Sequence, residues 1–218
     1  RGEDGTVRAF YNTCRHRGAT VVREKAGTAP HFQCQFHSWM YNLEGELVAI
    51  PDLRDFSNDP ALEDTHLHAV RCESWGGFIF INLSEDGPEL KTWLGPLAED
   101  FAWTEGLRTS NRRERVMACN WRVAVEAFIE VYHISTVHPD TVGQGLNHRG
   151  TVSNFYRTGH SRMIVPNPGW PDVPRKEPRT RIKDGARDEA YEFRAEANVS
   201  YNIFPNLLVP AGQTGFML

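Results

Sequence analysis

The sequence predicts an α+β protein with two domains, a strand-rich domain followed by one that combines helices and strands. Two observations predict this class. Short apolar runs separated by turn residues fill residues 1–86, whereas apolar residues at helical spacing begin near Trp121. The 218 residues can hold more than one core, because a domain takes roughly 100–200 residues. We therefore expect domains at residues 1–86 and 87–218.

The first domain is expected to consist of short strands joined by turns. Residues 6–11 and 31–33 are typical of strands, and Trp75–Leu83 predicts the strand that closes the domain. Gly18 and Gly45 lie where turns are needed.

The second domain is expected to open with two short helices, at residues 90–94 and 96–101. A longer helix is predicted to begin after Asn120. Its buried or half-buried face would be made by four residues at helical spacing, Val123, Ala127, Phe128 and Val131. Three apolar stretches then predict strands, at residues 154–156, 160–165 and 201–209.

Two short segments of the first domain each carry one cysteine and one histidine. They are Cys14-Arg15-His16 and Cys34-Gln35-Phe36-His37, with seventeen residues between them. Two cysteines and two histidines can hold a 2Fe–2S cluster, with both thiolates on one iron and both imidazoles on the other. An ordinary zinc finger instead takes both cysteines from one segment and both histidines from the next, so the mixed order favours the cluster. A structural zinc site is the alternative.

These segments and the residues that follow them resemble the two cluster loops of a Rieske iron–sulfur domain. The resemblance implies four cluster ligands, Cys14, His16, Cys34 and His37. Ser38 stands where these families commonly have glycine. Rieske proteins of quinol-oxidising complexes carry an extra cysteine in each loop, and this sequence has none there. The cluster therefore resembles the low-potential type of oxygenases and their ferredoxins.

A second motif runs from Asn120-Trp121-Arg122 to His138-Pro139. It resembles the iron-binding segment of the large subunits of Rieske non-haem iron oxygenases. The resemblance implies that His133 and His138 bind a mononuclear Fe(II) in a two-histidine, one-carboxylate site. It also implies a catalytic role for Glu130, as the bridge that carries electrons between an iron-site histidine and a cluster histidine of the neighbouring subunit.

The spacing of the two histidines constrains the local backbone. His133 and His138 are five residues apart, roughly 140° around an ideal helix. Both can face one metal only if the helix breaks or distorts between them. Ser135, Thr136 and their β-branched neighbours favour such a distortion.

The carboxylate that would complete this iron site is left unassigned. In the family it lies far after the histidines, which here means beyond Leu218. Four aspartates lie too early or in polar, loop-like sequence, namely Asp140, Asp172, Asp184 and Asp188. The sequence also starts at Arg1 without methionine and ends inside an apolar run at residues 216–218, so we expect the chain to be incomplete at both ends.

The resemblance also implies a fold, an activity and partners. The fold is a Rieske domain followed by a truncated helix-grip (START-like) catalytic domain, in a homotrimer with or without a small beta subunit. The activity is hydroxylation or dihydroxylation of a small substrate with O2, using electrons from NAD(P)H through a reductase, with or without a ferredoxin. An aromatic substrate is the first expectation.

Two further hypotheses stay open. One is a monooxygenase that demethylates or cleaves a quaternary amine such as carnitine or betaine, because the spacing around Glu130 fits that branch of the family. The other belongs to a different class, a Rieske electron-transfer protein without a working iron site.

Composition limits the remaining classes. The net charge of −4 argues against a nucleic-acid binder, and no apolar run reaches the roughly 18 residues of a membrane span. Cys72 and Cys119 are expected to be free buried thiols, which suits a reducing cytoplasm. His148 and His160 are expected at the surface.

Overall fold

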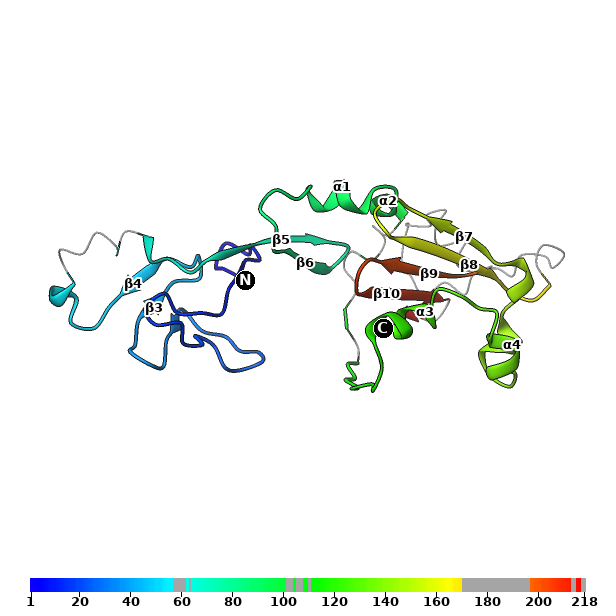
Figure 1. Cartoon of the computed structure of the whole chain (residues 1–218), viewed down its shortest axis with the longest axis horizontal. Coiled ribbons are helices and arrows are strands. Elements are labelled where there is room, and N and C mark those ends of the chain that lie inside the picture. The colour runs from blue at the N-terminus through cyan, green and yellow to red at the C-terminus, as the bar shows by residue number, and fades with distance from the viewer. Residues whose placement is uncertain are drawn as a thin grey trace, which may run out of the picture. The chain divides into compact units, whose positions relative to one another are not determined.

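The protein is described by a computed structural model that covers residues 1–56, 62, 64–100, 104, 108–109, 111–169, 197–212 and 215–216. It forms two compact units, one built on residues 1–92 with Thr104 and the other on residues from 93 onward. Figure 1 labels most of the helices and strands of both. The first unit is rich in short strands and the second combines helices with a sheet, which confirms the predicted α+β class.

The first unit contains two small antiparallel sheets. One has the order β1-β5-β6 and the other the order β2-β3-β4. The strands of the first sheet are β1 (Ala9–Phe10), β5 (Ala69–Trp75) and β6 (Phe78–Asn82). Those of the second are β2 (Phe32–Gln33), β3 (Met40–Tyr41) and β4 (Leu47–Ala49), followed by the short 3-10 helix η1 (Leu53–Asp55).

The predicted strand Trp75–Leu83 is wrong at its start. Trp75 ends β5 and pairs with Phe78, the first residue of β6, so the chain reverses at Gly76-Gly77. Both glycines have positive φ, 59° and 79°, as the central residues of a tight hairpin turn require. The apolar run after the glycines concealed a turn that the Gly-Gly pair itself signals.

Two short helices follow β6 in the chain, as predicted. They are α1 (Leu90–Leu94) and α2 (Leu97–Asp100). The Glu73 carboxylate accepts the N–H of Leu90 at 2.9 Å and so caps the first turn of α1. Leu90, Leu94 and Leu97 are buried.

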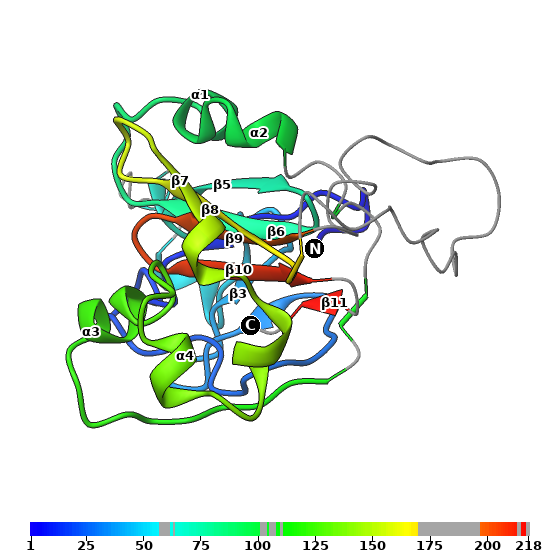
Figure 2. The same cartoon turned by 90° about the vertical axis from the view of Figure 1, so that its right-hand side faces the viewer.

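The second unit is built on a five-stranded antiparallel sheet with the order β11-β10-β9-β8-β7, seen in Figure 2. Its strands are β7 (Val152–Phe155), β8 (Ser161–Pro166), β9 (Ala197–Ile203), β10 (Leu207–Gly212) and β11 (Gly215–Phe216). The single strand predicted at 201–209 is wrong. Ile203 pairs with Leu207, so Phe204, Pro205 and Asn206 form the turn of a hairpin.

The long helix predicted after Asn120 is also wrong. Asn120 caps α3 (Trp121–Glu126) by accepting the N–H of Arg122 at 3.0 Å, and a second helix, α4 (Ile134–Val137), follows after a break. Val123 and Phe128 are 57% and 54% exposed, so the expected apolar face is not buried. Only Val131 of that set is buried, with Ile134, against Met163 and Val165 of β8.

A side chain competes with the helix at the break. The Glu130 carboxylate accepts the backbone N–H of Tyr132 at 2.6 Å, which takes that donor out of a helical ladder. The β-branched residues Ile129 and Val131 beside it are also weak helix formers. Two 3-10 turns follow α4, η4 (Val142–Gly145) and η5 (His148–Gly150).

The burial of several cysteine and histidine side chains differs from the prediction. All four cysteines are free, but Cys72 is only half-buried and Cys119 is exposed, so the prediction that both are buried is wrong. His148 is half-buried, whereas His160 is 1% exposed and lies in the core, so the predicted surface position of His160 is wrong. Among the described residues, no helix combines the length and the apolar character needed to cross a bilayer.

The burial of His160 is explained by two hydrogen bonds that fix its ring. Its Nδ1 accepts the N–H of Phe204 at 3.0 Å, so the proton of the neutral ring lies on Nε2, which donates to the Trp93 carbonyl at 3.0 Å. The partners are 44 and 67 residues away, too distant for a sequence pattern to reveal.

We predict a pH dependence of stability from this residue. Burial lowers the pKa of His160 below its ordinary value of 6.5. As the pH falls through 6.5, the unfolded chain takes up the proton first, so the free energy of unfolding decreases and is highest above that pH. Urea unfolding at pH 7.5 and pH 5.5 should show a smaller decrease in His160→Gln than in the wild type. His148→Gln should keep the wild-type difference, and equal pH dependence in all three proteins would contradict the prediction.

Candidate functional site

The two predicted Rieske loops fold in the same way. In each loop the cysteine N–H donates to the carbonyl five residues later, and the cysteine carbonyl accepts the N–H of the residue four positions later. These bonds are Cys14 to Ala19 (2.8 Å), Gly18 to Cys14 (2.9 Å), Cys34 to Trp39 (2.9 Å) and Ser38 to Cys34 (2.9 Å). The loops therefore present each cysteine from an equivalent tight turn.

This turn explains why glycine suits the position of Ser38. Gly18 has φ 72° and Ser38 has φ 57°, both in the left-handed region. That conformation costs about 1–2 kcal/mol for a residue with a side chain and little for glycine. Ser38 accepts this strain without a change in the loop's hydrogen bonds.

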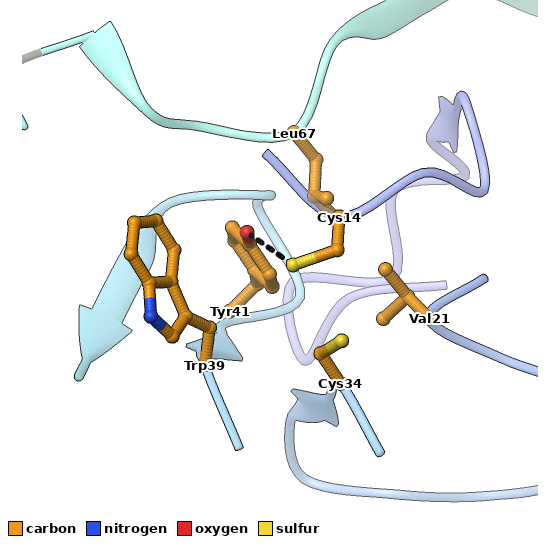
Figure 3. Close-up of a cluster of buried hydrophobic side chains, with 6 residues drawn as sticks. All are labelled: Cys14, Val21, Cys34, Trp39, Tyr41 and Leu67. Atoms are coloured by element: carbon orange, nitrogen blue, oxygen red, sulfur yellow. Dashed lines mark hydrogen bonds between the residues drawn. The ribbon is translucent and has the colours of Figure 1, made fainter. Parts of the chain in front are cut away.

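The two thiols are buried together in the core of the first unit. Cys14 and Cys34 are 3% and 1% exposed, and Figure 3 shows them in one cluster with Val21, Tyr41 and Leu67.

The Tyr41 hydroxyl lies 3.3 Å from Cys14 Sγ and accepts the N–H of Arg15 at 3.1 Å. Because the oxygen receives that N–H, its own proton is free to point at the sulfur. Burial raises the pKa of Tyr41 well above its usual range, so this proton is retained.

The two histidines of the loops lie against each other. The rings of His16 and His37 are 4.6 Å apart and cross at 72°, and His16 also stacks on Trp39 at 4.8 Å and 8°. His37 is exposed, whereas His16 is covered by the indole. Burial, followed by the charges of His37 and Arg17, lowers the pKa of His16, so its imidazole is neutral.

One atom of this group points to a missing partner. His16 Nδ1 is buried and has no hydrogen-bond partner. A buried ring nitrogen without a partner is costly unless a ligand satisfies it, and a neutral imidazole nitrogen is a metal ligand. Together with the buried thiols of Cys14 and Cys34 in the same two loops, this donor set fits a 2Fe–2S cluster.

The zinc alternative requires a different arrangement of ligands from that of a Rieske cluster. In the part of the chain that the structure describes, no group of three or more His, Cys, Asp or Glu side chains converges as a single-metal site. A structural zinc ion takes four ligands around one point, whereas each iron of a Rieske cluster takes only two from the protein.

The second predicted metal group lies around α4. His133 directly precedes the helix and His138 directly follows it, with φ −125° and ψ 43° at His138. The backbone stays helical from His133 to Val137 and leaves that conformation only at His138, so the break expected between the two histidines is not found. The two rings are 5.7 Å apart and cross at 72°.

Glu130 contacts the first of these histidines. Its carboxylate makes a short hydrogen bond with His133 Nδ1, which leaves Nε2 of that ring available to a metal. Partial burial raises the pKa of Glu130, but the hydrogen bonds from His133 and the Tyr132 N–H outweigh it and hold that pKa below its usual value. The carboxylate therefore stays ionised.

No carboxylate joins His133 and His138 as a third ligand among the described residues. Asp140 is described and exposed. Asp172, Asp184 and Asp188 lie outside the described residues.

Sequence reasoning missed two aromatic residues of the cluster site, Trp39 and Tyr41. Trp39 ends the second loop immediately before β3, and Tyr41 lies two residues later within β3. Period-2 spacing at the start of a strand puts two side chains on the same face. That pattern, shortly after His37, was the available signal.

We predict that Tyr41→Phe lowers the reduction potential of the cluster. A hydroxyl proton on a thiolate stabilises the reduced, more negative state, so its removal disfavours reduction. A hydrogen bond to a charged group contributes about 1.5–3 kcal/mol, which for a one-electron couple corresponds to a decrease of up to about 65–130 mV. A redox titration followed by EPR measures it. Tyr11→Phe, at an exposed tyrosine, should leave the potential unchanged, and an equal potential in Tyr41→Phe would refute the role of the hydroxyl.

Fold and site together define a Rieske-type iron–sulfur unit followed by an α+β unit with a histidine pair. Residues 1–69 match the Rieske [2Fe-2S] domain, and residues 103–217 match the ring hydroxylating alpha subunit (catalytic domain). The second match covers more than half of the chain. The chain therefore belongs to the ring hydroxylating alpha subunit family, which confirms the predicted family. Both domains imply an iron–sulfur cluster and a non-haem iron.

Known proteins show similarity along most of the chain. The N,N-dimethyl phenylurea N-demethylase subunit alpha of Sphingobium sp. (strain YBL2) is 31% identical over 94% of this chain and 50% of its own length. The glycine betaine monooxygenase oxygenase subunit of Chromohalobacter salexigens is 29% identical over 69% of this chain and 34% of its own. The chain thus spans half or less of the length of these relatives.

A solved structure shows the same fold. The naphthalene 1,2-dioxygenase from Rhodococcus sp., bound to indole, aligns with a TM-score of 0.81 and 27% identity, over 97% of this chain and 53% of that one.

Proposed function

We propose that the chain is part of the large subunit of a terminal oxygenase. It would use O2 and electrons from NAD(P)H, delivered by a reductase, to hydroxylate or dihydroxylate a small aromatic substrate. The observation that carries the proposal is the contact of Glu130 with His133 beside His138, in a chain that also has two Rieske loops. An electron-transfer protein has no use for the histidine pair and its carboxylate.

The proposed ligands follow from the donor sets. Cys14 and Cys34 would bind one iron of the cluster, and His16 and His37 the other. His133 and His138 would bind the mononuclear iron. When bound, the cluster supplies single electrons and the mononuclear iron activates O2.

Glu130 is suited to join the two centres. One carboxylate oxygen is taken by His133 and the other by the Tyr132 N–H, yet the side chain is 47% exposed. Each carboxylate oxygen has a second lone pair, so Glu130 can accept a further N–H from outside the chain.

The exposed ring of His37 is the better partner for that carboxylate, because Trp39 covers His16. We therefore propose that Glu130 meets His37 of a neighbouring copy in a trimer.

A second reaction is favoured by the relatives. The relative that aligns with 94% of this chain is an N-demethylase subunit, and another is a betaine monooxygenase subunit. Oxidation of an N-methyl group needs the same iron site, and the shape of the substrate pocket decides between the reactions. N-demethylation, including that of a quaternary amine, is therefore the alternative proposal.

Metal analysis of anaerobically purified protein tests the proposal. We expect the two irons and two sulfides of one [2Fe-2S] cluster plus one further iron, with a Rieske-type EPR signal after dithionite reduction. Cluster iron alone would point to the electron carrier, and zinc without sulfide would overturn the whole proposal.

A substrate panel then separates the reactions. A cis-diol or phenol product from an arene supports the first proposal. Formaldehyde from an N-methyl compound, or trimethylamine from carnitine, would replace it with the alternative.

A further inference from the structure

The side-chain amide of Asn12 spans the first Rieske loop. Its Oδ1 accepts the N–H groups of Val21 (3.1 Å) and Val22 (2.9 Å), and its Nδ2 donates to the Val22 carbonyl at 2.6 Å. One side chain thus satisfies three backbone groups at the far end of the loop. Asn12 itself lies two residues before Cys14, so the amide joins the beginning of the loop to its end.

The second Rieske loop is closed in a different way. β2 and β3 pair directly at its two ends, with Gln33 opposite Met40 and Phe32 opposite Tyr41. The first loop has no such ladder, because β1 ends at Phe10 and its pairing partner is β5. Val21 and Val22 lie outside every strand. The Asn12 amide therefore takes the place that strand pairing has in the second loop.

The clamped segment reaches the ligands through Val21. This residue is buried in the same core cluster as Cys14 and Cys34, and Figure 3 shows the three side chains together. The Cys14 N–H also bonds to Ala19, two residues before Val21. Fixing the backbone at Val21 therefore limits how far the sulfur-bearing turn can move.

We propose that Asn12 is a positioning residue of the cluster site. It holds the first loop closed so that Cys14 and His16 present their donor atoms together, and it acts through the backbone of Val21 and Val22. The inference rests on the proposed cluster ligands, and it adds a residue that those ligands depend on.

The chain offers a matched control in Asn42. Its Oδ1 accepts the N–H groups of Glu44 and Glu46, at 3.1 and 2.8 Å, and its Nδ2 donates to the Glu46 carboxylate at 2.8 Å. This amide also makes three hydrogen bonds across a turn, but the turn carries no proposed ligand. Loss of either amide removes the same kind of interaction, and only Asn12 lies in a cluster loop.

The test compares Asn12→Ala and Asn42→Ala in the cluster-loaded protein. The readouts are the rate at which an iron chelator bleaches the cluster and the shape of the EPR signal, with thermal unfolding measured in parallel. We expect Asn12→Ala to lose its cluster on the order of tenfold faster than the wild type and to show a broadened signal, because a loosened loop samples several ligand geometries. Asn42→Ala should lose stability to a similar extent with wild-type bleaching and signal.

Two outcomes would each refute one of the proposals. Equal bleaching rates and signals in the two variants would overturn the positioning role while leaving the cluster proposal intact. A wild-type protein without cluster iron and sulfide would instead refute the proposed function itself. If Asn12→Ala does not accumulate as folded protein, Asn12→Asp replaces it. That variant keeps the two acceptor bonds and loses the donor to Val22, so faster bleaching than in the wild type is expected and an unchanged rate would count against the inference.

Discussion

Replacing Glu130 by glutamine is expected to leave both metal centres loaded and to reduce coupled product formation by about 100-fold or more. The carboxylate already accepts His133 and the Tyr132 N–H, and the proposed bridge requires it to accept one more imidazole N–H. Glutamine has the same shape but only one acceptor oxygen. Its NH2 group would face an N–H donor, either that of His133 or that of Tyr132, and so one contact must break.

The measurement is product formed per electron in a single turnover of reduced protein, together with iron and sulfide content. Glu126→Gln is the matched control, since Glu126 is an exposed acid of α3 four residues earlier. It should retain wild-type coupling. Wild-type coupling in Glu130→Gln would remove this carboxylate from the electron path, and loss of iron from the same variant would make it a structural support of the histidine instead.

The cluster loops were predictable because their chemistry is local. Cysteine and histidine within three residues of each other leave few alternatives, and the structure places both pairs in equivalent turns. What the sequence did not reveal is how the loops are held. Trp39, Tyr41 and Asn12 act through stacking and hydrogen bonds to residues up to 27 positions away, and the spacing that singles out Trp39 and Tyr41 does not identify those partners.

The two strand errors in the fold have a common physical origin. At Trp75–Leu83 and at 201–209 a continuous apolar run hid a reversal of the chain, at Gly76-Gly77 and at Phe204–Asn206. A two-stranded hairpin and one long strand share the same composition when the turn itself is short or apolar. The prediction of one long helix after Asn120 was wrong for another reason. The Glu130 carboxylate accepts the Tyr132 N–H, which a continuous helix would need for its own hydrogen bonds.

The distinction between the two metal centres leads to the last prediction. His133→Ala is expected to remove the mononuclear iron and reduce oxygenation to background, about 1,000-fold or more, while the cluster keeps its iron, its sulfide and its EPR signal. The cluster loops belong to the first compact unit and His133 to the second, so the loss of one imidazole in the second unit leaves the donor set of the first intact. Only one ring would remain at the iron site from this segment.

Metal and sulfide analysis with EPR on the same samples measures the loss of each metal centre separately. Cys34→Ala should give the reverse result, because it should lose the sulfide and the Rieske signal and retain the mononuclear iron. His148→Ala is the control, because His148 is a half-buried histidine of the same unit outside the proposed ligand set. It should keep all the iron and its activity. If His133→Ala retains the full iron content, the metal is held by other residues. The hydrogen bond between Glu130 and His133 would then only stabilise the break between α3 and α4 and would not belong to an iron site.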